Sequence, residues 1–157
     1  MGAEADSEAF TAFVREHERR IWQAVAPVAG PDAANDAVAE AFVVAWRNWE
    51  RVRSMENAPG YVYRVASRAA RPRRRPLLLG GRPDEARLPQ VEPGLRAALL
   101  SLSEMQRTVV FLVEAWDWTQ AEAAALLGIS PSTVRNHLQR GMERLRRELE
   151  VEIDAHE

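Results

Sequence analysis

The sequence contains no cysteine, only three histidines, and no lysine among its 21 basic residues. Without cysteine the chain cannot form disulfides, thiolate metal sites or a cysteine nucleophile. Its absence also fits the cytoplasmic location that we predict. No apolar run approaches the roughly 18 residues that a membrane-spanning helix needs, so no membrane insertion is expected. The acidic start, MGAEADSEAF, lacks an apolar run and is not expected to act as a signal peptide.

Signatures of common enzymes are missing as well. The sequence has no phosphate-binding loop and no nucleophile elbow, and its histidines are scattered at positions 17, 137 and 156. We therefore predict neither a cofactor nor a metal, and an enzyme is the poorest fit. Hydrophobic residues make up 46% of the chain and charged residues 28%, which is an ordinary globular balance.

Basic charge is concentrated in two islands of a slightly acidic chain. The formal net charge is −2, yet residues 63–82 contain seven arginines and no acidic residue. Residues 119–147 carry a net charge of +3. Local charge of this kind suits contact with nucleic-acid phosphates, whereas a solvated arginine-rich linker is the plainer interpretation of the first island.

Hydrophobic spacing in the first half predicts three helices. The first is expected to start at Ser7 and to be interrupted by Pro27, Gly30 and Pro31. The second should start near Asp32 and be followed by a loop over residues 51–60. Pro59 could be the first residue of the third helix, which Pro72 should end because proline lacks an amide hydrogen.

The second half predicts four more helices, and no stretch shows the alternation of a strand. Their expected ranges are 95–102, 105–116, 119–127 and 131–150. Between the halves, residues 73–93 are rich in proline and glycine and are expected to form a flexible linker. The predicted fold is all-α: two small helical domains, the C-terminal one a four-helix domain.

Residues 119–145 match a helix-turn-helix. Thr119 and Glu122 have the spacing of a capping box, and Gly128 suits a left-handed helix end. Ser130 and Pro131 can then cap and begin the second helix. The side chains expected to project from that helix are Thr133, Arg135, Asn136, His137, Gln139 and Arg140.

These outward residue types fit DNA recognition. Arginine can donate two hydrogen bonds to guanine, and asparagine or glutamine can pair with adenine. A helix carrying them fits the major groove. An ordinary helical hairpin with a polar surface is the alternative, which the combination of two caps, a glycine and a proline makes improbable.

The combination of both halves resembles a known family. PDAANDAVAEAFVVAWRNWERV and APGYVYRVASRAARPRRR resemble region 2 of bacterial RNA polymerase sigma factors of the extracytoplasmic-function group. LRAALLSLSEMQRTVVFLVEAWDWTQAEAAALLGISPSTVRNHLQRGMERLRREL is similar to their region 4. The corresponding domains are residues 1–72 and 94–150, with a linker at 73–93 and an acidic tail at 151–157.

The resemblance implies a transcription initiation factor that binds core RNA polymerase and promoter DNA. Region 4 would recognise the minus-thirty-five element through its helix-turn-helix, and region 2 would bind polymerase and melt the minus-ten element. The implied polymerase-binding residues are Asp36, Glu40, Phe42, Trp46 and Arg47. The implied minus-ten contacts are Arg64, Arg68, Arg71 and Tyr61 or Tyr63, with Met55, Glu56 and Asn57 in the loop that holds a flipped base.

Two positions depart from the family pattern. Relatives usually have asparagine at the position of Arg68 and aspartate at the position of Pro72, and they continue the third helix further. We therefore expect promoter melting to be weaker, differently specific or dependent on a partner.

Two rival functions stay open on the sequence alone. A stand-alone helix-turn-helix regulator would bind paired half-sites as a dimer, although no dimerising coiled coil is evident. A polymerase-binding adaptor without promoter melting would explain the Pro72 departure. The family resemblance further implies an anti-sigma protein as a possible partner.

Overall fold

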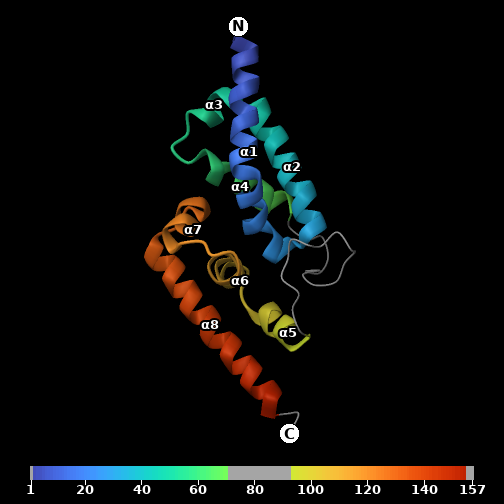
Figure 1. The fold of residues 1–157 in the computed structure, drawn as a ribbon, viewed down its shortest axis with the longest axis vertical. Coiled ribbons are helices and arrows are strands. Elements are labelled where there is room, and N and C mark those ends of the chain that lie inside the picture. The colour runs from blue at the N-terminus through green and yellow to red at the C-terminus, as the bar shows by residue number, and fades with distance from the viewer. Residues whose placement is uncertain (1, 71–92, 155–157) are drawn as a thin grey trace.

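The computed structural model describes residues 2–70 and 93–154, and every regular element within these ranges is a helix (Figure 1). The first half comprises α1 (Gly2–Ala29), α2 (Pro31–Arg47), α3 (Trp49–Arg53) and α4 (Ala58–Ala69). The second half comprises α5 (Pro93–Ser101), α6 (Glu104–Val110), the π-helix η1 (Phe111–Ala115), α7 (Gln120–Leu127) and α8 (Pro131–Asp154). The predicted all-α class and the four-helix second half are confirmed.

The predicted linker falls almost entirely outside the described residues, and so do the last three residues of the predicted acidic tail. The expected linker, residues 73–93, does so except for its last residue, which begins α5. The expected acidic tail starts inside α8, which extends to Asp154. None of the helices within residues 2–70 and 93–154 is long and apolar enough to cross a membrane.

The first helix is longer than predicted at both ends. It begins at Gly2 rather than Ser7 and continues through Pro27 to Ala29. Of the three residues predicted to interrupt this helix, Pro27 does not, whereas the chain does turn at Gly30 and Pro31 begins the next helix. The ring of Pro27 is fully buried. The turn comes at Gly30, whose φ of 86° suits glycine.

Aromatic packing and an ion pair connect the N-terminal part of α1 to the helices beside it. The Phe10 ring centre lies 5.0 Å from that of Trp46 and 5.1 Å from that of Trp49. An ion pair between Asp6 and Arg53 links the preceding turn of α1 to α3. Such ring pairs add to the free energy of burial, so α1 packs against the core from Phe10 onward, whereas its residues 2–5 are exposed.

The loop predicted over residues 51–60 is shorter than expected. The short helix α3 occupies its first residues, and α4 begins at Ala58 rather than Pro59. Asn57 caps α4, because its Oδ1 accepts a hydrogen bond from the amide of Gly60 at 2.9 Å. The helix ends at Ala69, before Pro72 as predicted, although Pro72 itself lies outside the described residues.

The predicted helix over residues 105–116 consists of an α-helical part followed by a π-helical part. It starts as α6, capped by Ser103 and Gln106, and widens into η1 after Val110. The wider turn brings the amide of Trp118 to the carbonyl oxygen of Leu112 at 2.9 Å. The spacing of hydrophobic residues in a sequence does not reveal a π-helix. Such segments are often found at functional sites.

A buried arginine connects α5 to α6. Arg107 is only 5% exposed, and its guanidinium donates to the carbonyl oxygens of Leu99, Leu100 and Leu102 at 3.0 to 3.2 Å. The carbonyl groups at a helix end lack some or all of their helical partners, and Leu99 has only one other donor, the amide of Leu102. Arg107 therefore acts as a side-chain cap inside the second half.

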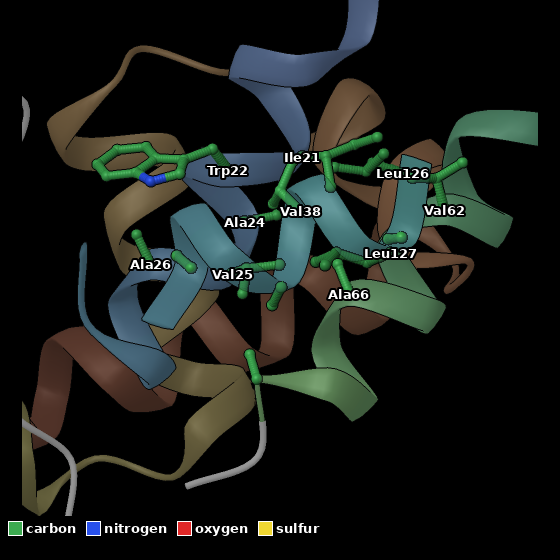
Figure 2. Close-up of a cluster of buried hydrophobic side chains, with 14 of the residues drawn as sticks. Ile21, Trp22, Ala24, Val25, Ala26, Val38, Val62, Ala66, Leu126 and Leu127 are labelled. Carbon is green, nitrogen blue, oxygen red and sulfur yellow. The ribbon is translucent and has the colours of Figure 1, made fainter. Parts of the chain in front are cut away.

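One hydrophobic core extends across both halves of the chain. Leu126 and Leu127 of α7 belong to the same cluster as Ile21 of α1 and as Val62 and Ala66 of α4 (Figure 2). Burying each leucine contributes roughly 1.5–3 kcal/mol. The sequence predicted two separate helix clusters, so this shared core is a new finding.

We predict that Arg107→Met destabilises the protein by about 1.5–3 kcal/mol, because three carbonyl groups lose a charged hydrogen-bond donor. Urea unfolding followed by circular dichroism measures the change. The control is Arg146→Met at an exposed position on α8, which should change stability by less than about 0.5 kcal/mol. Equal effects of the two substitutions would contradict the capping role.

Candidate nucleic-acid and polymerase interfaces

The predicted helix-turn-helix is present, with its capping interactions formed. Thr119 Oγ1 accepts from the amide of Glu122 at 3.1 Å, and Glu122 Oε2 accepts from the amide of Thr119 at 2.9 Å. Gly128 has a φ of 68°, the left-handed conformation expected of it. Ser130 Oγ accepts from the amide of Thr133 at 3.1 Å and so caps α8. These contacts confirm the predicted caps and turn.

One face of α8 is packed and the other faces solvent. Val134 and Leu145 are buried, whereas Leu138 and Met142 are half-buried. On the outer side four of the six predicted DNA-reading residues are exposed: Arg135, Asn136, Gln139 and Arg140. The other two, Thr133 and His137, are half-buried.

Some of these side chains already have partners. The Thr133 hydroxyl lies 2.7 Å from that of Ser130, and Gln139 Nε2 donates to Glu143 Oε1 at 3.2 Å. Neither Arg135 nor Arg140 forms an ion pair with any residue that the structure describes. These two guanidinium groups therefore keep their donors available for bases or phosphates.

A second arginine surface lies on α4. Arg64 and Arg68 are exposed, and Val62 and Ala66 on the opposite side are fully buried. Within residues 2–70 and 93–154 neither arginine is neutralised by an acidic side chain. Arg71, predicted to extend this row, lies outside the described residues. The two arginines present a positive face suited to phosphates.

The candidate base-stacking residues are less accessible. Tyr61 and Tyr63 both pack partly against the core, and burial raises the pKa of the Tyr63 hydroxyl. In the loop before α4, Glu56 is exposed and Met55 packs against the core. Asn57 donates through Nδ2 to the carbonyl oxygen of Ala125 at 2.7 Å. The loop predicted to hold a flipped base therefore contacts α7.

The predicted polymerase-binding residues form a stripe along α2. Asp36, Glu40 and Arg47 are exposed on one face, and no ion pair involves the two acids within the described residues. Trp46 is 44% exposed, but Phe42 is only 7% exposed and packs beneath the surface. The sequence analysis missed Val43, which is 49% exposed at the same helical spacing. The stripe thus combines acidic charge with apolar surface.

Among the described carboxylates, Glu122 has the most strongly shifted pKa. A hydrogen bond from Arg20 and two bonds from Thr119 lower its pKa from 4.5 to about 2. Arg20 Nη2 lies 2.6 Å from Glu122 Oε1. The sequence analysis did not find Arg20, because it lies on the solvent side of α1, 102 residues from its partner. Within the described residues no group of histidine or acidic side chains could hold a metal ion.

Two family descriptions match the chain. Residues 13–76 match "Sigma-70 region 2", and residues 94–145 match "Sigma-70, region 4". The chain belongs to the sigma-70 family. Region 2 followed by region 4 is the organisation of the extracytoplasmic-function group, as the resemblance predicted. This sigma factor is a transcription initiation factor that directs RNA polymerase to promoters.

A solved structure shares the fold of this sigma factor. It is that of the sigma factor RpoE from Bartonella quintana, determined in complex with the anti-sigma factor NepR. The similarity covers 92% of this chain and 98% of RpoE, with a TM-score of 0.61 and 18% identity. At this identity the likeness concerns the fold alone. No curated protein matches the sequence significantly.

We predict that Glu122→Gln changes the dependence of stability on pH. The folded-state pKa is depressed, so the contribution of the carboxylate is complete above about pH 4.5 and is lost as the pH falls toward 2. The variant should be less stable than the wild type at pH 7, and the difference should shrink by pH 2.5. Urea midpoints measured across this range test it.

The matched control is Glu114→Gln, because Glu114 is exposed and has no ion-pair partner among the described residues. Its profile should follow that of the wild type. A constant difference between Glu122→Gln and the wild type from pH 7 to pH 2.5 would contradict the assigned role of the carboxylate.

Proposed function

We propose that α8 reads the minus-thirty-five element while α4 and the loop before it contact the minus-ten element. The observation that carries the proposal is the pair of arginine surfaces, one in each half, that lack acidic partners among the described residues. On α8 these are Arg135 and Arg140, next to the amide side chain of Asn136. On α4 they are Arg64 and Arg68. Their charge favours phosphates, and the mixed polar groups of α8 suit base edges.

Core polymerase would bind the stripe along α2. Its acidic residues, Asp36 and Glu40, can pair with a basic surface and set the register of binding. Trp46 and Val43 add exposed apolar area beside them. Aromatic side chains are common among the residues that dominate binding energy at interfaces. Phe42 would support this surface from below rather than touch the polymerase. Binding to polymerase and chromosomal DNA would place the protein in the cytoplasm.

Promoter melting by this chain would differ from that of its relatives. Arg68 adds positive charge where relatives usually carry a neutral amide, and α4 ends at Ala69. Fewer groups are then available on α4 to hold an unstacked strand, and extruding a base costs a few kcal/mol. Melting would consequently depend more on the polymerase or on a favourable promoter. The similar fold of RpoE, solved with NepR, also supports an anti-sigma protein as a partner.

Transcription from a genomic library by core polymerase, with and without this protein, tests the proposal. Start sites that appear only with the protein, and that share two upstream elements, are expected. Core binding without new start sites would favour an adaptor that does not melt promoters. A palindromic footprint without polymerase would favour a stand-alone regulator.

We predict that Arg135→Ala relaxes base preference at one position of the minus-thirty-five element, at a cost of about 1–3 kcal/mol in promoter binding. Loss of a bidentate donor removes discrimination at that position but leaves phosphate contacts in place. Binding to a promoter library, followed by sequencing, measures the change. Arg146→Ala, further along α8, should leave the preference unaltered. An unchanged preference in Arg135→Ala would remove this residue from base recognition.

We predict that Asp36→Arg weakens binding to core polymerase at least about tenfold, because it reverses a charge within a complementary interface. The matched control is Glu114→Arg, because Glu114 is an exposed acidic residue outside α2 and has no ion-pair partner among the described residues. Fluorescence anisotropy with labelled protein measures both affinities, and circular dichroism verifies folding. Equal affinities of Asp36→Arg and the wild type would exclude Asp36 from the interface.

A further inference from the structure

A cavity of about 520 Å³ lies between α1, α2 and the segment that follows η1. Its buried part consists of Trp22 and Gln23 of α1 and Val38 of α2, which are at most 7% exposed. Trp116 forms a half-buried wall, and its ring centre lies 6.2 Å from that of Trp22. The volume is within the range of roughly 300–1,000 Å³ that is typical of small-molecule sites. None of these residues belongs to the proposed DNA or polymerase surfaces.

The backbone around Trp116 is unusual in two respects. It follows η1, and π-helices are frequently found at functional sites. The next residue, Asp117, has a φ of 56° and is the one non-glycine residue with a positive φ in the part of the chain that the structure describes. Such a backbone is uncommon outside glycine, and its occurrence at the edge of a cavity favours a role in binding.

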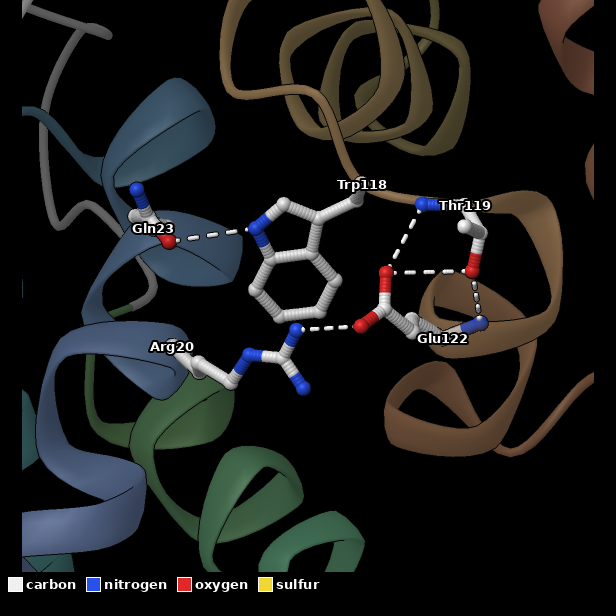
Figure 3. A network of polar contacts seen from close by, with 5 residues as sticks. All are labelled: Arg20, Gln23, Trp118, Thr119 and Glu122. Carbon is white, nitrogen blue, oxygen red and sulfur yellow. Dashed lines mark hydrogen bonds and ion pairs between the residues drawn. The ribbon is translucent and has the colours of Figure 1, made fainter.

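Gln23 supplies an unused hydrogen-bond donor in the buried part of the cavity. Its Oε1 accepts from Trp118 Nε1 at 3.1 Å (Figure 3). Its Nε2 donates to no described residue, although the residue is only 7% exposed. Buried polar groups in proteins are almost always hydrogen-bonded, so this amide needs an acceptor that a bound molecule or water supplies.

The rim of the cavity carries one charge of each sign. Glu18 and Arg19 of α1 and Asn35 of α2 line it and are exposed. Neither Glu18 nor Arg19 forms an ion pair with any residue that the structure describes. A simple anion would be repelled by Glu18, and a simple cation would be repelled by Arg19. The rim is therefore complementary to a ligand that carries both charges.

The aromatic rings beside the cavity favour an aromatic group on that ligand. The Trp116 ring centre lies 5.6 Å from that of Phe111 and 6.2 Å from that of Trp22, with the ring planes tilted by 45° and 55°. Tilted rings at such distances attract one another beyond their burial of area. A ligand ring that contacts Trp116 in the cavity would extend this series of ring pairs.

We propose that the cavity binds a small zwitterion with an aromatic side group, which is the chemistry of a free aromatic α-amino acid. The Arg19 guanidinium and Nε2 of Gln23 bind the carboxylate of the ligand. Glu18 binds its ammonium group, and its ring packs against Trp116 and Val38. The inference goes beyond the proposed function, because this binding requires neither DNA nor polymerase.

Titration of the full-length protein with L-phenylalanine tests the proposal by calorimetry and by saturation-transfer NMR. Three related ligands each lack one feature. Phenethylamine has no carboxylate, 3-phenylpropionate has no ammonium group, and L-leucine keeps both charges but has no ring. Phenylalanine should bind with a Kd of about 2 mM or lower, which is the affinity expected of a ligand of this size.

Phenethylamine and 3-phenylpropionate should each bind at least about fivefold more weakly than phenylalanine, because each lacks one charged group and keeps the group that the other rim charge repels. Leucine should bind about threefold to tenfold more weakly, because the ring contact is lost. No binding of phenylalanine up to about ten times the expected Kd would overturn the proposal. Equal affinities for phenylalanine and either singly charged ligand would contradict the assigned charge pairing.

Variants locate the ligand in the cavity. Arg19→Gln and Glu18→Gln should each weaken phenylalanine binding at least about threefold, and circular dichroism verifies that they fold. The matched controls are Arg51→Gln and Glu50→Gln, at exposed positions of α3 outside the cavity, which should bind as the wild type does. Wild-type affinity in Arg19→Gln would place the ligand elsewhere and refute the site. Equal losses in Arg19→Gln and Arg51→Gln would show unspecific attraction and would refute it too.

Discussion

The packing of α7 against α1 and α4 is the contact on which the arrangement of this sigma factor depends. Leu126 and Leu127 pack into one core with Ile21 and Val62. At the edge of that core, Trp118 donates a hydrogen bond to Gln23 and Arg20 forms an ion pair with Glu122 (Figure 3). Apolar burial supplies most of the free energy, whereas the buried hydrogen bond and the ion pair define how the halves fit.

Local capping determines where the functional side chains lie. Glu122 and Thr119 start α7, Gly128 ends it, and Ser130 starts α8, so the outer face of α8 has a fixed orientation relative to the core. Arg107 likewise fixes the end of α5 against α6 through hydrogen bonds to three backbone carbonyl oxygens. Recognition helices need this rigidity, because a base contact is lost when its side chain shifts by about an ångström.

The sequence predicted local features well because they depend on residues close together in the chain. The capping box at Thr119, the left-handed Gly128 and the buried stripe of α8 were each visible as short-range patterns. Pro27 was misread because its local effect on the helix is outweighed by tertiary packing, in which the proline is fully buried. The ion pair between Arg20 and Glu122 could not be predicted, since both residues look like solvated helix residues until tertiary packing brings them together. Val43 was missed because periodicity does not say which apolar residues stay exposed.

The distance between the two regions tests the central claim most directly. Donor and acceptor dyes on Ala12→Cys in α1 and Ala121→Cys in α7, both at exposed positions, would report it in the free protein. The account predicts efficient energy transfer and one narrow distance distribution, because α7 and α1 share one hydrophobic core. Inefficient transfer with a broad distribution, as expected of two domains joined only by a flexible linker, would contradict it.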